Sequence, residues 1–185
     1  MRILFGISLV TVAALAVATV RADDVQSGPT DKIGGAFNVK AITGEHRVGD
    51  KKEELCYVCK YNAQARPAVV LIFTQKADEN LAAVVKAIDE VQKSNKDLGT
   101  VVVGVGGVKD ADFEKLQETQ KFTTPLTIAV AQDGPPAYKL SKEAVVTVLV
   151  YKQGGQILKN FAFKDTKAAA EKAKDIAAAA SAAVK

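Results

Sequence analysis

The sequence predicts an α/β fold in which helices cover both faces of a mostly parallel central sheet. Continuous apolar runs rich in β-branched residues recur along the chain, as is typical of strands covered on both faces. Segments with helical spacing of apolar residues separate these runs, and this alternation favours parallel strands. Two further strand-like runs near the C-terminus are joined by Lys-Gln-Gly-Gly-Gln, which predicts a closing antiparallel hairpin.

The first predicted strand is short and lies at residues 36–42, where Phe37, Val39 and, more weakly, Ala41 alternate with other residues. A charged region with the composition of turns follows it at residues 43–54. The run PAVVLIF at residues 67–73 is apolar throughout, so it predicts a strand buried on both faces.

The first long helix is predicted at residues 77–95, with Asp78 as its N-cap. Its apolar residues recur at helical spacing and charged residues occupy the other side. They are Leu81, Val84, Val85, Ile88 and Val91. The run TVVVGV at residues 100–105 then predicts the next buried strand.

A second helix is predicted at residues 109–122, because Phe113 and Leu116 share one face and Asp110 can cap the helix. The apolar run PLTIAVA at residues 125–131 predicts another strand. The sequence DGPPAYKL that follows predicts a turn leading into a short helical piece.

The C-terminal part is predicted to form the hairpin, at residues 145–163, and then a helix that is favoured by its alanine content. A stripe of mostly small residues along this helix would allow close contact with the sheet. The stripe consists of Ala169, Ala173, Ile176, Ala180 and Val184. A frayed, solvated tail is the alternative interpretation.

The N-terminus has the layout of a secretory signal peptide over residues 1–22. Arg2 precedes an uncharged, mostly apolar stretch, and Val20 and Ala22 are suitable residues before a cleavage site. A retained membrane anchor is the alternative, since 18 uncharged residues nearly span a bilayer. We expect residues 23–35 to be a flexible lead-in and residues 36–185 to form one domain. The protein is therefore expected to be secreted or periplasmic, and not attached to a membrane once the signal is removed.

The composition is that of a globular protein, with 48% hydrophobic and 25% charged residues. Without residues 1–22 the chain carries 23 basic and 21 acidic residues, a net charge of +2. This small charge and the lack of a basic stripe argue against nucleic acid as a partner. Gly-Val-Gly-Gly at residues 104–107 does not complete a phosphate-binding fingerprint, and no cofactor is expected.

Cys56 and Cys59 are the only cysteines, and they form a Cys-x-x-Cys pair ahead of the strand at 67–73. Three interpretations are open. The pair can be a redox-active dithiol, a local structural disulfide, or two ligands of a copper or zinc ion together with His46, the only histidine. A closed zinc site requires four ligands, which this sequence does not offer.

The order of elements resembles the thioredoxin-like superfamily, and within it the peroxiredoxin-like branch. FNVKAITG is similar to the opening strand of that branch, PAVVLIF and the following helix to its core strand and first long helix, and VVTVLVYKQGGQIL to its hairpin. The resemblance covers roughly residues 36–180. The family's reactive cysteine or cysteine pair would directly follow PAVVLIF, but this chain has TQKADEN there. Val146 also stands where thioredoxins have their cis-proline.

The resemblance implies thiol–disulfide exchange or redox sensing through the displaced pair, with protein thiols or disulfides as partners. By the order usual in the superfamily, Cys56 would attack and Cys59 would resolve. A peroxidase is not expected, because the peroxide-attacking cysteine is absent from its usual position. The alternative class is a non-catalytic binding or scaffold domain with a structural disulfide, and a metal carrier is the third. The sequence does not specify the oligomeric state.

Overall fold

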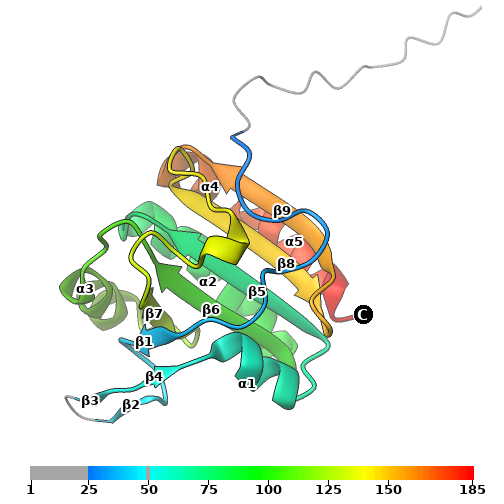
Figure 1. Ribbon diagram of the computed structural model, residues 1–185, viewed down its shortest axis with the longest axis horizontal. Coiled ribbons are helices and arrows are strands. Elements are labelled where there is room, and N and C mark those ends of the chain that lie inside the picture. The colour runs from blue at the N-terminus through cyan, green and yellow to red at the C-terminus, as the bar shows by residue number, and fades with distance from the viewer. Residues whose placement is uncertain (1–24, 49–50) are drawn as a thin grey trace, which may run out of the picture.

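The computed structural model describes residues 25–48 and 51–185. In this part of the chain a mixed sheet of seven strands forms, in the order β4-β1-β7-β6-β5-β8-β9 (Figure 1). Its strands are β1 (Val39–Ala41), β4 (Glu54–Leu55), β5 (Ala68–Thr74), β6 (Leu98–Gly104), β7 (Leu126–Ala129), β8 (Val146–Lys152) and β9 (Ile157–Phe163). The predicted signal peptide at residues 1–22 lies outside the described residues.

The centre of the sheet is parallel, as predicted. Strand β5 pairs in parallel with β6, and β6 pairs in parallel with β7. Strands β8 and β9 form the predicted antiparallel hairpin, in which β8 runs antiparallel to β5. On the other side of the sheet, β1 and β4 add two short antiparallel pairings. The predicted α/β class, with its C-terminal hairpin, is confirmed.

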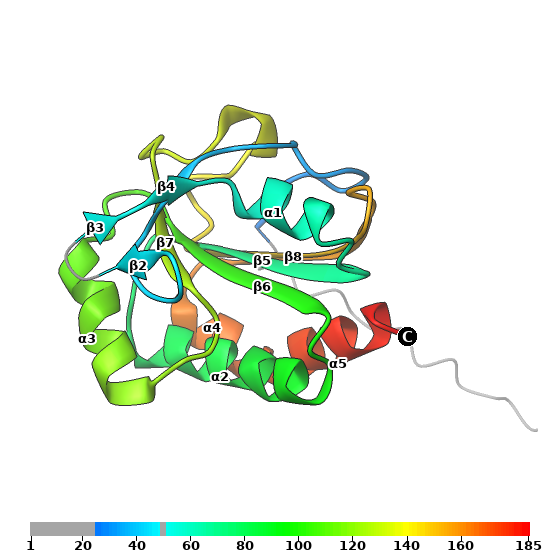
Figure 2. The ribbon, with the colours of Figure 1, turned by 90° about the horizontal axis from the view of Figure 1, so that it is seen from below.

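Helices cover both faces of the sheet (Figure 2). Helix α1 and the chain from residue 25 to β1 lie on one face, whereas α2, α4 and α5 lie on the other. The helices are α1 (Tyr57–Ala63), α2 (Glu79–Ser94), α3 (Asp110–Gln120), α4 (Thr166–Glu171) and α5 (Ala173–Ala183), and a short 3₁₀ helix spans Pro136–Tyr138. A small separate hairpin consists of β2 (Arg47–Val48) and β3 (Lys51–Lys52).

Strand β5 explains why the sequence builds two hydrophobic cores. All seven of its residues are buried, and alternate side chains point to opposite faces. Val70 and Ile72 pack among residues of α2 and α5. Val69, Leu71 and Phe73 pack on the other face, with Tyr57 and Tyr61 of α1. Helix α1 is thus held against the sheet by these two tyrosines.

The structure differs from the sequence predictions at helix α1 and at the start of α3. Helix α1 lies between the charged region at residues 43–54 and the strand predicted at 67–73, where the sequence predicted no helix or strand. Lys109, rather than Asp110, is the N-cap of α3. Asp110 is the first helical residue, and its carboxylate instead accepts hydrogen bonds from Lys40 and Lys52 at 2.9 and 2.7 Å.

Of the predicted flexible lead-in at residues 23–35, residues 25–35 are described, and they pack on the sheet. Ser27 is buried. The side-chain amide nitrogen of Asn160 in β9 donates to the backbone carbonyl oxygens of Ser27 and Pro29, at 2.9 Å each. At the other terminus, the alanine-rich tail forms α4 and α5. Its small-residue stripe lies against the sheet, as predicted, with Ala169, Ile176 and Ala180 fully buried.

Candidate functional site

The two cysteines lie where strand β4 leads into helix α1. Cys56 is the N-cap of α1 and has an extended backbone, while Cys59 lies in the first turn. The two residues form a disulfide, with 5.3 Å between their Cα atoms. The backbone N–H of Cys59 donates to Sγ of Cys56 at 3.1 Å. The pairing with β1 fixes β4, and the two buried tyrosines fix α1, so both ends of this turn are anchored.

The two cysteines differ in exposure. Cys59 is exposed to solvent, whereas Cys56 is half-buried. The disulfide therefore lies at the surface, as a site for exchange with another molecule requires. Helix α1 directs Tyr57 and Tyr61 inward toward the sheet, and this orientation turns the first-turn residue Cys59 outward.

A groove of about 490 Å³ borders both cysteines. No charged residue lines it, and its walls include Phe37, Pro135 and Tyr138. Val130 also lines the groove, and its 53% exposure makes it an exposed large hydrophobic residue. Such an uncharged surface beside a disulfide is suited to contact with an apolar stretch of another chain.

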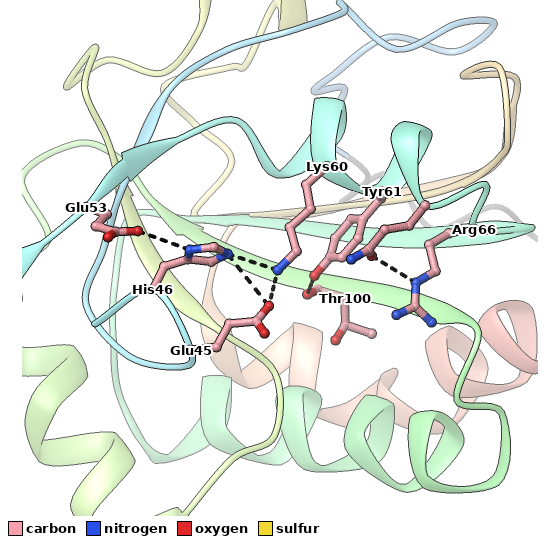
Figure 3. A network of polar contacts seen from close by, with 8 residues as sticks. Glu45, His46, Glu53, Lys60, Tyr61, Arg66 and Thr100 are labelled. Carbon is pink, nitrogen blue, oxygen red and sulfur yellow. Dashed lines mark hydrogen bonds and ion pairs between the residues drawn. The ribbon is translucent and has the colours of Figure 1, made fainter. Parts of the chain in front are cut away.

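His46 lies beside α1 in a network of polar contacts (Figure 3). One of its ring nitrogens, Nδ1, is 3.2 Å from a carboxylate oxygen of Glu53, and Nε2 is 2.9 Å from Nζ of Lys60. Lys60 also pairs with Glu45. His46 packs edge-on against the ring of Tyr57, with 5.9 Å between the ring centroids.

The structure does not bring Cys56, Cys59 and His46 together as metal ligands. Within residues 25–48 and 51–185, no group of three His, Cys, Asp or Glu side chains is placed to hold a metal ion. The disulfide also leaves neither sulfur as a thiolate, which is the form that binds metal. His46 is instead engaged by the carboxylate and ammonium groups around it.

The position that the resemblance assigns to a reactive cysteine is occupied by other interactions. Thr74 is buried, and its hydroxyl donates to the carbonyl of Lys76 at 2.6 Å. The side-chain amide of Gln75 donates to the carbonyl of Ala144 at 2.8 Å, and it also contacts the carbonyls of Ser141 and Lys142. Asp78 caps α2. This segment thus joins the end of β5 to the loop before β8.

Sequence reasoning identified the cysteine pair but missed its surroundings. The groove that contains Val130 is formed by segments far apart in the sequence, which no local pattern reveals. The contacts of Lys60 with Glu45 and His46 depend on helix α1, which was not predicted. The one available signal was the spacing of Tyr57 and Tyr61, four residues apart, which indicates one buried face of a helix.

No protein-family model and no curated protein sequence matches this chain. Solved structures do match it in fold. A protein from Chlorobium tepidum described as the thiol:disulfide interchange protein DsbE has a TM-score of 0.55 and 16% identity, over 85% of this chain and 99% of that one. A protein from Bacteroides thetaiotaomicron described as a protein disulfide isomerase has a TM-score of 0.54 and 16% identity, over 82% and 92%.

A third similar structure is the peroxidoxin BcpB from Mycobacterium tuberculosis, with a TM-score of 0.50 and 17% identity, over 83% of this chain and 96% of that one. At this level of identity the similarity shows the fold alone. The chain thus has a thioredoxin-like fold, and both thiol–disulfide proteins and a peroxidoxin are among the structures similar to it.

Proposed function

We propose that this protein exchanges disulfides with protein thiols through Cys56 and Cys59. The observation that carries the proposal is the surface position of the disulfide, beside an uncharged groove. The thioredoxin-like fold supports it, since similar structures include proteins described as thiol–disulfide interchange proteins. The proposal places the reactive pair at the start of α1 and not after β5.

The exchange begins when a thiolate of the partner attacks Sγ of Cys59, the exposed residue of the pair. A mixed disulfide forms between the partner and Cys59, the bond between Cys56 and Cys59 breaks, and Cys56 leaves as a thiolate. The N–H of Cys59, which contacts Sγ of Cys56 at 3.1 Å, stabilises that charge.

A second thiolate of the partner then attacks the partner's own sulfur in the mixed disulfide. Cys59 leaves as a thiolate, which takes up a proton from solvent, as does Cys56. The partner's dithiol is thereby oxidised to a disulfide, and the pair is reduced to two thiols. The same steps in reverse reduce a partner's disulfide.

Insulin reduction by dithiothreitol tests the activity. We expect the protein to accelerate precipitation of the insulin B chain, and Cys56→Ser and Cys59→Ser to abolish this effect. Ala63→Ser is the matched control, because it adds a hydroxyl to the exposed side of the same helix. Equal rates with the wild-type protein and both cysteine variants would rule out the exchange function.

The reduction potential separates exchange from a structural role. We expect a value between about −120 and −270 mV, the range of the exchange enzymes. A value below about −300 mV would indicate a structural disulfide in a scaffold domain.

We also propose that the protein functions outside the cytoplasm, where its disulfide can persist. The support is the signal-like sequence of residues 1–22, which lie outside the described residues. Among the described residues, no helix has the length and apolar character needed to cross a membrane. N-terminal sequencing of the exported protein should give Asp23 as the first residue, whereas a chain that still begins at Met1 would contradict cleavage.

A further inference from the structure

A second groove, of about 410 Å³, borders Cys59 and adjoins the uncharged groove described above. Cys59 and Ala36 line both grooves, so the two meet at the exposed cysteine. Ile33 lines only the second groove and Phe37 lines only the uncharged one. The chain that leads to β1 therefore passes from one groove to the other beside the disulfide.

The backbone of this segment has unused hydrogen-bond donors. None of the N–H groups of residues 34–37 donates a hydrogen bond within the described part of the chain, and these residues are exposed or half-buried. The segment is nevertheless held in place. The Tyr138 hydroxyl donates to the carbonyl of Gly35 at 2.8 Å, and a Cβ atom at Gly34 would lie only 2.7 Å from the backbone of Ala137. A fixed backbone with unpaired N–H groups is suited to pair with an extended segment of another chain.

The two grooves differ in charge. No charged residue lines the uncharged groove, whereas Lys32 and Arg66, both cations, line the second one. Arg66 already contacts Asp97 and the carbonyl of Lys96. Lys32 is exposed and forms no ion pair with the described part of the chain. The charge of Lys32 is therefore available to a partner, and it favours an acidic side chain there.

We propose that the two grooves together bind one extended segment of a partner protein. The cysteine of that segment reaches Cys59, with an apolar side chain on one side of it and an acidic side chain on the other. The apolar side chain lies in the uncharged groove beside Val130, and the acidic one lies near Lys32. Backbone carbonyls of the segment accept from the N–H groups of residues 34–37. This inference rests on the proposed exchange function and names the kind of cysteine segment that the protein selects.

Peptide binding tests the docking apart from the exchange, because serine can replace the cysteine of the partner. The probes are the capped pentapeptides Leu-Thr-Ser-Thr-Glu and Glu-Thr-Ser-Thr-Leu, which represent both chain directions, and the same peptides with Lys in place of Glu. Nuclear magnetic resonance titration of the oxidised protein measures their affinity from the amide signals of Ala36 and Val130. We expect saturable shifts and, in at least one direction, about two- to fivefold tighter binding of the Glu peptide at low salt.

The absence of saturable shifts with all four peptides would overturn the proposal, as would equal affinity of the Glu and Lys peptides in both directions. Shifts of the same signals on raising the protein concentration without peptide would assign the grooves to a second copy of the chain, and would overturn it too.

Methylation of the peptide backbone tests the pairing with residues 34–37. Successive N–H groups of an extended chain point to opposite sides, so only one of two neighbouring groups faces the protein. We therefore prepare the tighter-binding Glu peptide with an N-methyl group either on its serine or on the threonine that follows. One of the two should bind at least about threefold more weakly than the unmethylated peptide, and unchanged affinity of both would contradict the backbone pairing.

Lys32→Glu is the decisive variant, because it reverses the available charge of the second groove. We expect its preference to be inverted, so that the Lys peptide binds more tightly than the Glu peptide. Lys159→Glu is the matched control, since it makes the same charge change at an exposed position outside both grooves and should keep the preference for Glu. An unchanged preference in Lys32→Glu would overturn the proposal. Insulin reduction measured in parallel reports separately on the exchange function.

Discussion

At the scale of single residues, the two cysteines differ in exposure and in hydrogen bonding. Cys59 is exposed, and Cys56 is half-buried with its sulfur accepting a backbone N–H. The superfamily order implied that Cys56 would attack. Exposure favours Cys59 as the first sulfur to meet a partner, whereas the hydrogen bond favours Cys56 as the sulfur that leaves with the charge.

Alkylation of the reduced protein distinguishes the two orders. We expect access to decide the rates, so that a limiting amount of iodoacetamide modifies the exposed residue Cys59 several times faster than Cys56, although the N–H of Cys59 favours the thiolate of Cys56. Mass spectrometry of the digested protein measures the ratio, and the unfolded, reduced chain is the control in which the difference should disappear. Faster modification of Cys56 would restore the order that the resemblance implied.

The residues of the site could be predicted from the sequence only in part. The cysteine pair was evident because two cysteines three residues apart form a local motif. The sequence also offered His46 as a third metal ligand beside the two cysteines. The structure instead places His46 between Glu53 and Lys60. The choice between these environments depends on contacts between loop 44–46 and α1, which a linear sequence does not specify.

At the scale of elements, a strand or helix could be predicted where it was long and where its residue pattern was uninterrupted. Strand β5 comes from an uninterrupted apolar run and helix α2 from a long pattern at helical spacing, so their types and positions were predicted correctly. Helix α1 has seven residues, and isolated helices shorter than about 12–15 residues are marginal in water. Burial of Tyr57 and Tyr61 against the sheet stabilises it, and this tertiary effect is not visible in the local sequence.

The predicted N-cap of α2 is confirmed, and it joins two helices. Oδ1 of Asp78 accepts from the N–H groups of Asn80 and Leu81, and Oδ2 accepts from the hydroxyl of Thr166 in α4 at 2.8 Å. Burial opposes ionisation, but the hydrogen bond from Lys76 and those from Leu81 and Thr166 outweigh it and lower the pKa of Asp78 below 3.8. The ionised carboxylate therefore stabilises the fold at neutral pH, and this contribution is lost as the pH falls through the lowered pKa.

Replacing Asp78 tests this linkage by urea unfolding at pH 7 and at pH 3. Asp78→Ala should lower the free energy of unfolding by about 1 kcal/mol at pH 7, through loss of the cap. Asp78→Asn keeps the cap acceptor and should cost less. Both deficits should shrink at pH 3, which lies below the ordinary pKa of an aspartate, because the unfolded chain takes up a proton there and the carboxylate contributes less to stability. The control is Asp175→Asn, whose exposed pair with Lys172 should contribute less than about 1 kcal/mol. Equal deficits of the Asp78 variants at both pH values would contradict the linkage.

Gln75 connects the end of β5 to the loop before β8, at the position where the superfamily has its reactive cysteine. We expect Gln75→Ala to speed amide hydrogen exchange in residues 141–145, because three carbonyls of that loop lose their donor. Insulin reduction should be retained, since the proposed site lies on α1. Loss of insulin reduction with an intact disulfide would instead locate the activity at the end of β5.

At the scale of the whole molecule, the fold consists of one sheet with a hydrophobic core on each face, and the disulfide closes only a short turn. The cores lie on opposite faces of β5 and include residues of α2 and α5 on one face and of α1 on the other. The overall layer arrangement was predictable because alternating strands and helices leave few topologies. The packing of residues 25–35 on the sheet was not, since their polar, glycine-containing sequence resembles that of a free segment.

Reduction of the disulfide should leave the protein folded. A bond between residues three apart closes a very small ring, so the loss of chain entropy on cross-linking stabilises the fold by about 2 kcal/mol or less. For a chain of this length, we expect reduction to lower the melting temperature by no more than about 8 °C, with little change in the near-ultraviolet circular dichroism spectrum. Cys56→Ser/Cys59→Ser, measured without reductant, is the matched control. A larger fall, or loss of the near-ultraviolet signal, would mean that the disulfide is structural, because a protein that unfolds on each reduction could not present the groove beside Cys59 to its next partner.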